Sequence, residues 1–287
     1  MPETADRPAS AARGRRRRLW MGLATLLGRR PRGFFIPHRY ADRVTPCDYP
    51  ALEARFAAHV EAFDQVLSAV EELAPALERL GGPPPAPRFD QGWFAPFDAC
   101  VAYALVATRR PRRIVEVGSG HSTRFLARAI ADRALGTTLV CIDPAPRATL
   151  RGLPVRWQES TVQAAPESWF TDLTSRDLLF IDSSHILMPG TDVDWLLNRI
   201  LPALDAGVLI HVHDVFLPDP YPAAWAWRGY NEQQALAALL QGGAYAIRFA
   251  SHWVATRRRA RLEGGVLGRL PGGLEGLASS LWLEKQG

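Results

Sequence analysis

The sequence lacks an apolar run of the roughly 18 residues that a membrane-spanning helix requires. Its longest candidate, residues 19–28, is too short. Cysteine is also scarce, because only Cys47, Cys100 and Cys141 occur, and their wide spacing predicts neither a disulfide framework nor a zinc site. These absences argue against a membrane-spanning protein and against one stabilised by disulfides, and they favour a cytoplasmic, globular chain.

The positive charge is concentrated at one end of the chain. The net charge is +5, but residues 1–43 hold eleven arginines against three acidic residues, a balance of +8 that leaves −3 for the remainder. This distribution predicts a basic, flexible N-terminal arm over 1–43 and no nucleic-acid-binding face. The arginines beside residues 19–27 could instead bring the arm to an anionic membrane surface or an acidic partner.

A helical extension is expected over residues 44–92. Apolar residues recur every three or four positions across 51–80, which predicts a helix, and the stretch GGPPPAP at 81–87 predicts a stiff linker. Another helix is expected at about 96–109. The main domain is predicted to cover 93–287.

Strand-like and helix-like patterns alternate from residue 113 onward. We expect strands at 114–118, 138–143, 154–158, 177–182, 206–214, 244–250 and 279–285, and helices at 122–134, 165–173, 192–204 and 231–240. This order predicts an α/β fold with a doubly wound, Rossmann-like sheet of seven strands. The sheet should be mostly parallel, with the last strand returning antiparallel at its edge. Residues 251–278 are expected to form an irregular excursion, either a lid or a loop.

The stretch EVGSGHST, residues 116–123, predicts a glycine turn between a strand and a helix. Gly118 permits a sharp turn, Gly120 lets a ligand approach the backbone, and the helix start favours a carboxylate or phosphate. Asp143 ends the next strand, where an acid that binds ribose hydroxyls is expected. A dinucleotide would need a third glycine where Thr123 stands, so the pattern favours S-adenosylmethionine over a nicotinamide cofactor.

Four motifs, EVGSGHST, CIDP, DLLFIDSSH and GVLIHVHDVFLPDPYP, together resemble the class I S-adenosylmethionine-dependent methyltransferases over roughly 90–250. The branch related to catechol-type small-molecule O-methyltransferases is the most similar, and YNEQ also resembles bacterial methyltransferases of glycan and natural-product pathways. The cofactor-binding residues that the resemblance implies are Glu116, Gly118, Ser119 and Gly120 beside the methionine part, Asp143 at the ribose, Gln163 near the adenine, and Asp182.

The resemblance also implies a candidate metal site. In the catechol-type relatives the fourth strand ends in a metal-binding Asp, which Asp182 matches, followed by a lysine base at the place of His185. The relatives complete the site with a pair of residues after the fifth strand, where this chain has His213 and Asp214. Histidine suits Mn²⁺, Fe²⁺ or Zn²⁺ better than Mg²⁺. A hydrogen-bonded pair of His213 and Asp214 without metal is the alternative.

Histidine is also the expected base. A hydroxyl acceptor reacts faster when its proton is removed during attack, and an imidazole with a pKa near ~6.5 suits that task. His185 and His213 are therefore the catalytic candidates. Aromatic residues in the loop 215–232 are expected either to form an acceptor pocket or to pack that loop against the sheet.

The combined prediction is O-methylation of a small-molecule or glycan hydroxyl by a chain that could associate with copies of itself. Three rival functions stay open. They are a nicotinamide-dependent oxidoreductase, a metal-dependent hydroxylase-like enzyme on the same fold, and a non-catalytic binding protein.

Overall fold

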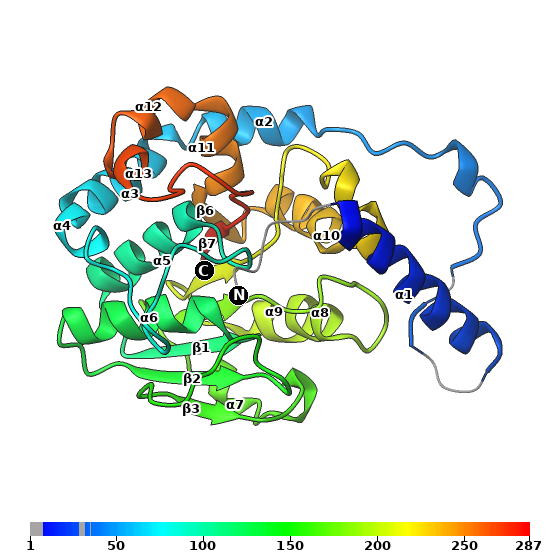
Figure 1. The fold of residues 1–287 in the computed structure, drawn as a ribbon, viewed down its shortest axis with the longest axis horizontal. Coiled ribbons are helices and arrows are strands. Elements are labelled where there is room, and N and C mark those ends of the chain that lie inside the picture. The colour runs from blue at the N-terminus through cyan, green and yellow to red at the C-terminus, as the bar shows by residue number, and fades with distance from the viewer. Residues whose placement is uncertain (1–7, 29–31, 35) are drawn as a thin grey trace.

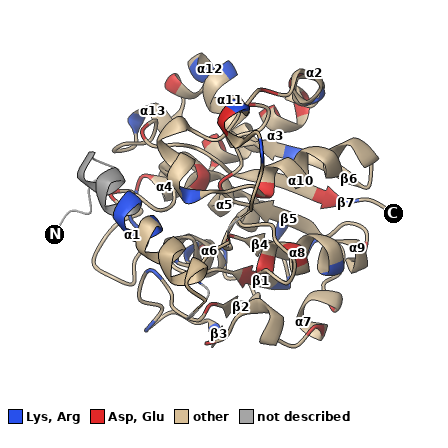
Figure 2. Ribbon diagram, turned by 90° about the vertical axis from the view of Figure 1, so that its right-hand side faces the viewer, with Lys and Arg blue, Asp and Glu red and all other residues tan. Residues whose placement is uncertain are grey.

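The computed structural model describes residues 8–28, 32–34 and 36–287, and only the backbone of 8–14. A seven-stranded sheet runs through the middle of the molecule, with helices on both faces (Figures 1 and 2). Its strands are β1 (Arg113–Val117), β2 (Thr138–Ile142), β3 (Arg156–Gln158), β4 (Leu178–Ile181), β5 (Leu209–Val212), β6 (Tyr245–Ala250) and β7 (Leu281–Lys285). The predicted α/β, Rossmann-like fold class is confirmed.

The strand order is β3-β2-β1-β4-β5-β7-β6, and β7 is antiparallel to both of its neighbours. The prediction that the last strand lies at the sheet edge was wrong, because β6 takes the edge and β7 inserts between β5 and β6. The sequence of β7 suits this interior place. Leu281, Trp282 and Leu283 are buried, and both backbone edges of the strand pair with neighbours.

Three helices pack together on one face of the sheet: α3 (Val60–Glu72), α5 (Pro96–Arg109) and α6 (His121–Asp132). Pro96 occupies the first turn of α5, where its fixed φ suits a helix and its missing N–H costs no hydrogen bond. The other face carries α8 (Asp192–Trp195), a π-helical turn η3 (Leu196–Ile200), α9 (Leu201–Ala203) and α10 (Glu232–Leu239) (Figure 2). The helices on the two faces bury β1, β4 and β5, and the carboxyl ends of these three strands lie together at one rim of the sheet.

Some predicted helices are interrupted. The helix expected over 51–80 is three helices, α2 (Pro50–Ala57), α3 and α4 (Ala74–Leu77). The helix expected over 192–204 contains the π turn. The remaining short elements are α7 (Ser168–Thr171), η1 (Ala41–Arg43), η2 (Val162–Ala164), η4 (Ala223–Arg228) and η5 (Leu240–Gly242).

The excursion 251–278 is not irregular. It forms α11 (Ser251–Arg257), α12 (Arg259–Glu263) and α13 (Val266–Arg269), which lie beside α2 and α3 (Figure 1). Arg258 donates to Asp64 of α3 at 2.7 Å, and the N–H of Val266 donates to Glu71. No residue of 251–278 lines either cavity described below, so this segment is not a lid over the described site.

The N-terminal helix α1 (Pro8–Leu26) lies beside η4 at the periphery of the molecule (Figure 1). Residues 8–26 of the arm expected over 1–43 are therefore helix, while 1–7, 29–31 and 35 lie outside the described residues. Within the described part of the chain, no helix is both long and apolar enough to cross a membrane. The boundaries predicted for the arm, the extension and the main domain stay predictions.

Candidate active site

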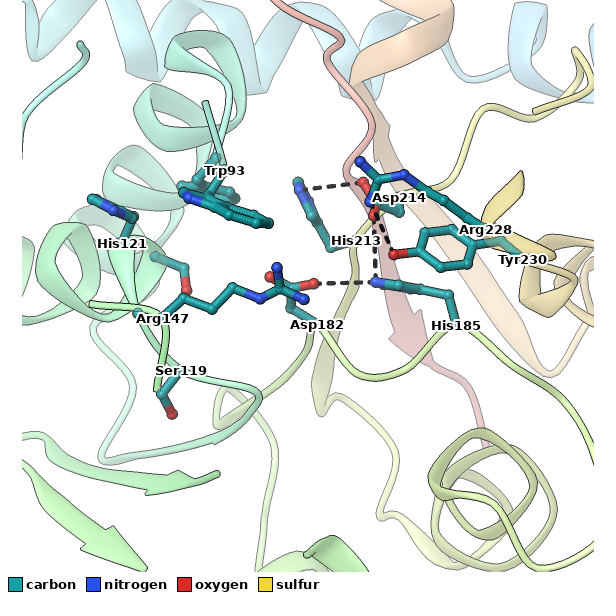
Figure 3. A pocket seen from close by; sticks show the side chains of 13 residues that line it. Trp93, Ser119, His121, Arg147, Asp182, His185, His213, Asp214, Arg228 and Tyr230 are labelled. Carbon is teal, nitrogen blue, oxygen red and sulfur yellow. Dashed lines mark hydrogen bonds and ion pairs between the residues drawn. The ribbon is translucent and has the colours of Figure 1, made fainter. Parts of the chain in front are cut away.

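Two cavities meet at the rim where β1, β2, β4 and β5 end. The larger, about 570 Å³, lies beside the glycine turn, Asp143 and the segment 160–163. The smaller, about 40 Å³, lies among the histidines that follow β4 and β5 (Figure 3). Asp182 and Arg147 line both cavities, so a molecule in one would reach a molecule in the other at these two residues.

Gly118 makes the turn that opens the larger cavity. Its φ is 80°, and a Cβ there would collide with the carbonyl group of Asp182, so only glycine fits. Gly120 differs, because a Cβ at this position would meet the following loop at 3.5 Å, an ordinary contact. Lack of space for a side chain therefore does not explain why position 120 is a glycine. Gly120 lines the smaller cavity together with Ser119.

Glu116 lies beneath the turn and lines neither cavity. Its fully buried carboxylate accepts hydrogen bonds from Ser122 at 2.7 Å and Thr123 at 2.6 Å. Thr123 in turn accepts from the N–H of Gly120 at 2.9 Å. Burial raises the pKa of Glu116 to about 7, although these hydrogen bonds partly oppose the shift. The structure thus places Glu116 under the turn, where its hydrogen bonds support the turn.

Asp143 is held rigidly at the rim of the larger cavity. One carboxylate oxygen accepts from the N–H of Ser119 at 2.6 Å and the other from the N–H of Ala145 at 2.7 Å. Each oxygen retains a lone pair that a ribose hydroxyl could use. Gln163 lines the same cavity and donates to the carbonyl of Gly190 at 3.1 Å.

The lining of the larger cavity fits an adenosyl group. Its walls combine apolar side chains with a few polar ones, as small-molecule sites do. Two hydroxyls in this lining, those of Ser160 and Ser183, are buried and have no hydrogen-bond partner among the described residues. Buried hydroxyls usually have partners, so these two are suited to donate to or accept from a bound molecule.

The imidazole of His185 lies among three carboxylates. Its Nε2 is 3.3 Å from Oδ1 of Asp182 and 3.4 Å from Oδ2 of Asp214, and its Nδ1 is 2.9 Å from Oε2 of Glu232 (Figure 3 shows the first two). The side chain is only 4% exposed. Tyr230 covers the ring at a centroid distance of 4.6 Å.

Two residues of this cluster have unusual backbones. His185 has φ 60° and Asp214 has φ 55°, in the left-handed region that non-glycine residues seldom adopt. Such conformations persist where surrounding contacts enforce them, and they gather at functional sites. Here the N–H of Asn231 donates to the carbonyl of His185 at 3.1 Å, which fixes the backbone that presents the ring.

The charges of the cluster shift the pKa values of His185, His213 and Asp182 so that each side chain favours its charged form. Burial lowers the pKa of His185, but Asp182, Asp214 and Glu232 more than offset this and raise it well above its ordinary value. The pKa of His213 is also raised, because Asp182 and Asp214 outweigh burial. Burial raises the pKa of Asp182, yet the two histidines hold it at about 2.

The candidate metal site is not formed. Among the described residues, no three His, Cys, Asp or Glu side chains are arranged to hold a metal ion. The physical reason is that the ring of His185 lies between Asp182 and Asp214, where a cation shared by the two carboxylates would lie. His213 and Asp214 lie within ion-pair distance, with Nε2 3.6 Å from Oδ1, which is too long for the hydrogen bond of the metal-free alternative.

The lining of the smaller cavity includes Trp93, Arg147 and Arg228, which the sequence reasoning missed. Arg147 stacks on Trp93 at 4.2 Å, and Arg228 donates to the hydroxyl of Tyr230 at 3.1 Å. Tyr230 is the only aromatic residue of the loop 215–232 in the lining of this cavity, as far as the described residues show. Trp225 packs against Phe216 at 5.1 Å instead. The loop aromatics therefore serve mainly to pack the loop.

Residues 115–215 match a protein family described as a methyltransferase domain. This span, about a third of the chain, runs from β1 to just beyond β5 and contains the glycine turn and the histidine cluster. The match and the seven-stranded sheet support the class I S-adenosylmethionine-dependent methyltransferase that the motifs predict, with S-adenosylmethionine as its cofactor. No protein of curated function matches the chain.

Solved structures with some likeness are methyltransferases. The plantazolicin methyltransferase BpumL in complex with SAH is 14% identical, with 67% of this chain and 85% of that one covered and a TM-score of 0.44. A putative O-methyltransferase from Klebsiella pneumoniae is 18% identical over 83% and 97%, with a TM-score of 0.42. SAH-bound PaMTH1 from Podospora anserina is 17% identical over 89% and 100%, with a TM-score of 0.42. Likenesses this low carry no conclusion about the substrate.

Proposed function

We propose that this chain is an O-methyltransferase that acts on a hydroxyl of a small molecule or glycan. The observation that supports this most strongly is that Asp182 and Arg147 line both cavities. The larger cavity would then hold the cofactor and the smaller one the reacting part of the acceptor. Methyl transfer needs the acceptor in line with the methyl group, and two cavities that share a wall could provide that alignment.

The cofactor, when bound, supplies an electrophilic methyl group on a sulfonium sulfur. In the proposed arrangement Asp143 accepts from the ribose hydroxyls, while Gln163 and the hydroxyls of Ser160 and Ser183 border the remainder of the larger cavity. Asp182 faces the junction of the two cavities with a carboxylate that stays charged at neutral pH, which suits a nearby positive sulfur.

His213, in the neutral form that becomes more populated as pH rises through its raised pKa, is the base we propose for the acceptor hydroxyl. It lines the smaller cavity, and Asp214 at 3.6 Å stabilises the imidazolium that forms when His213 takes the proton. The role that we propose for His185 is different from the base expected from the sequence. Held by Asp182, Asp214 and Glu232, it acts as a fixed organic cation that orients the two carboxylates.

The first test is a transfer assay with isotopically labelled S-adenosylmethionine. The acceptors are catechols, simple phenols and reducing sugars, each beside an analogue in which an amine replaces the hydroxyl. Label on the hydroxyl compounds alone supports the proposal, whereas label on the amines alone would overturn O-methylation.

Variants then separate the two histidines. His213→Gln should lower kcat by about 100-fold or more, as the loss of a general base does, with SAH affinity unchanged. His38→Gln is the matched control because His38 is exposed and lines neither cavity. Full activity in His213→Gln would remove His213 from the mechanism.

A further inference from the structure

The helix α1 presents a continuous apolar face to solvent. Its members are Leu19, Trp20, Leu23 and Leu26, which are 65%, 56%, 49% and 62% exposed, together with Leu27, which directly follows the helix and is 69% exposed. At about 100° of rotation per residue, these positions fall within an arc of roughly 120° on one side of the helix axis. We call this set the apolar face of α1.

The opposite side of α1 is turned toward the protein. Met21, Gly22, Ala24 and Thr25 are half-buried, and α1 contacts η4 (Figure 1). Arg18 donates to the carbonyl of Ala226 in η4 at 3.5 Å. The helix is therefore seated with its apolar face outward, and folding of the described chain does not bury that face.

Arginines flank the apolar face. Arg15, Arg16, Arg17 and Arg18 precede it and are exposed, and Arg32 stacks on Trp20 at 4.9 Å (Figure 2 shows basic residues on α1). The same rotation places Arg15 and Arg16 on the side of the apolar residues. The sequence from 8 to 28 contains no acidic residue, so the charge of this segment is not compensated within it.

We propose that α1 binds the surface of an anionic lipid bilayer, with its apolar face in the acyl boundary and its arginines at lipid phosphates. Arginine forks match phosphate geometry, and tryptophan and leucine suit the interfacial region. The helix carries too many charged residues to span a bilayer, so it would lie along the surface. A second copy of α1 would bring no acidic residue to these arginines, which disfavours self-association through this helix.

The test uses the purified full-length chain and flotation with vesicles. One set contains phosphatidylcholine with phosphatidylglycerol, and the other contains phosphatidylcholine alone. We expect binding to the anionic set that weakens as salt increases, because ions screen the arginine–phosphate attraction. Replacing Arg15 and Arg16 with Gln should weaken binding about 25-fold, at about fivefold for each charge. The matched control replaces the exposed Arg79 and Arg133 with Gln.

A second pair of variants tests how much the apolar face of α1 contributes to vesicle binding. Leu23→Ser should weaken binding about tenfold or more through loss of apolar burial. Leu277→Ser should leave it unchanged, although Leu277 is 47% exposed and Leu23 49%. Circular dichroism and SAH binding confirm that each variant is folded.

Three outcomes would overturn the proposal. The first is absence of vesicle binding, and the second is equal binding to both vesicle types. The third is a lipid-free dimer that Leu23→Ser dissociates, which would assign the apolar face to a second copy of the chain.

Discussion

The buried charge pair of His185 and Glu232 gives the sharpest prediction. Glu232→Gln keeps an oxygen near Nδ1 of His185, where Oε2 now lies at 2.9 Å, but removes the negative charge. Removing one partner of a buried pair costs about 3–5 kcal/mol, and a retained acceptor reduces that cost. We therefore expect the free energy of unfolding to fall by about 2 kcal/mol near neutral pH.

The pH dependence of this stability loss shows whether it comes from the charge of His185. The pKa of His185 is raised in the folded protein, so its contribution to stability is complete below its unfolded pKa of ~6.5 and is lost as pH rises through the folded value. The Glu232→Gln variant lowers that folded pKa. The stability difference between wild type and variant should thus shrink in alkaline solution, where His185 loses its proton, and also in acid, where Glu232, whose pKa burial raises, gains one.

Urea denaturation at several pH values measures this difference. Glu275→Gln, at an exposed position, is the control and should show no difference at any pH. A Glu232→Gln variant as stable as the wild type, or equally destabilised at every pH, would refute the idea that His185 is a buried cation.

Three further predictions use the same geometry. Methyl transfer should persist in EDTA, because His185 lies where a metal shared by Asp182 and Asp214 would lie; loss of turnover that Mn²⁺ or Mg²⁺ restores would contradict this. Gly118→Ala should destabilise the chain by more than about 2 kcal/mol in thermal denaturation, since alanine would adopt φ 80° and collide with Asp182. The free energy of unfolding of the wild type should fall as pH rises through about 7, because folding raises the pKa of Glu116. The Glu116→Gln variant should lack this pH-dependent part of the stability. Identical dependence of stability on pH in the two proteins would contradict the prediction.

The fold could be predicted because its signals are local. The strands β1 and β4 are short, largely apolar runs followed directly by Gly118 and Asp182, and the pattern between them alternates regularly. The place of β7 could not be predicted in the same way. Whether a returning strand takes the edge or inserts beside β5 depends on pairing with β6, far away in the sequence.

The residues of the site also differ in whether local sequence signals could reveal them. Gly118, Asp143 and Asp182 were found because each follows a strand, and the ends of parallel strands meet at one rim. Glu116 lies in the same motif but points into the core, which its spacing alone does not reveal. Glu232 was missed because it opens a helix 47 residues after His185, and only the folded chain brings the two together. The predicted metal ligands do not form a metal-binding group among the described residues, since the backbone conformation at His185 carries its ring between the carboxylates.

The most direct test of the central claim is calorimetric titration of the chain with S-adenosylhomocysteine. The account predicts binding in the micromolar range or tighter, abolished by Asp143→Ala and unchanged by Asp205→Ala at an exposed position. It also predicts that a chelator has no effect on this binding. Absence of binding by the folded wild type, or equal affinity in the Asp143→Ala variant, would contradict the cofactor site described for the larger cavity.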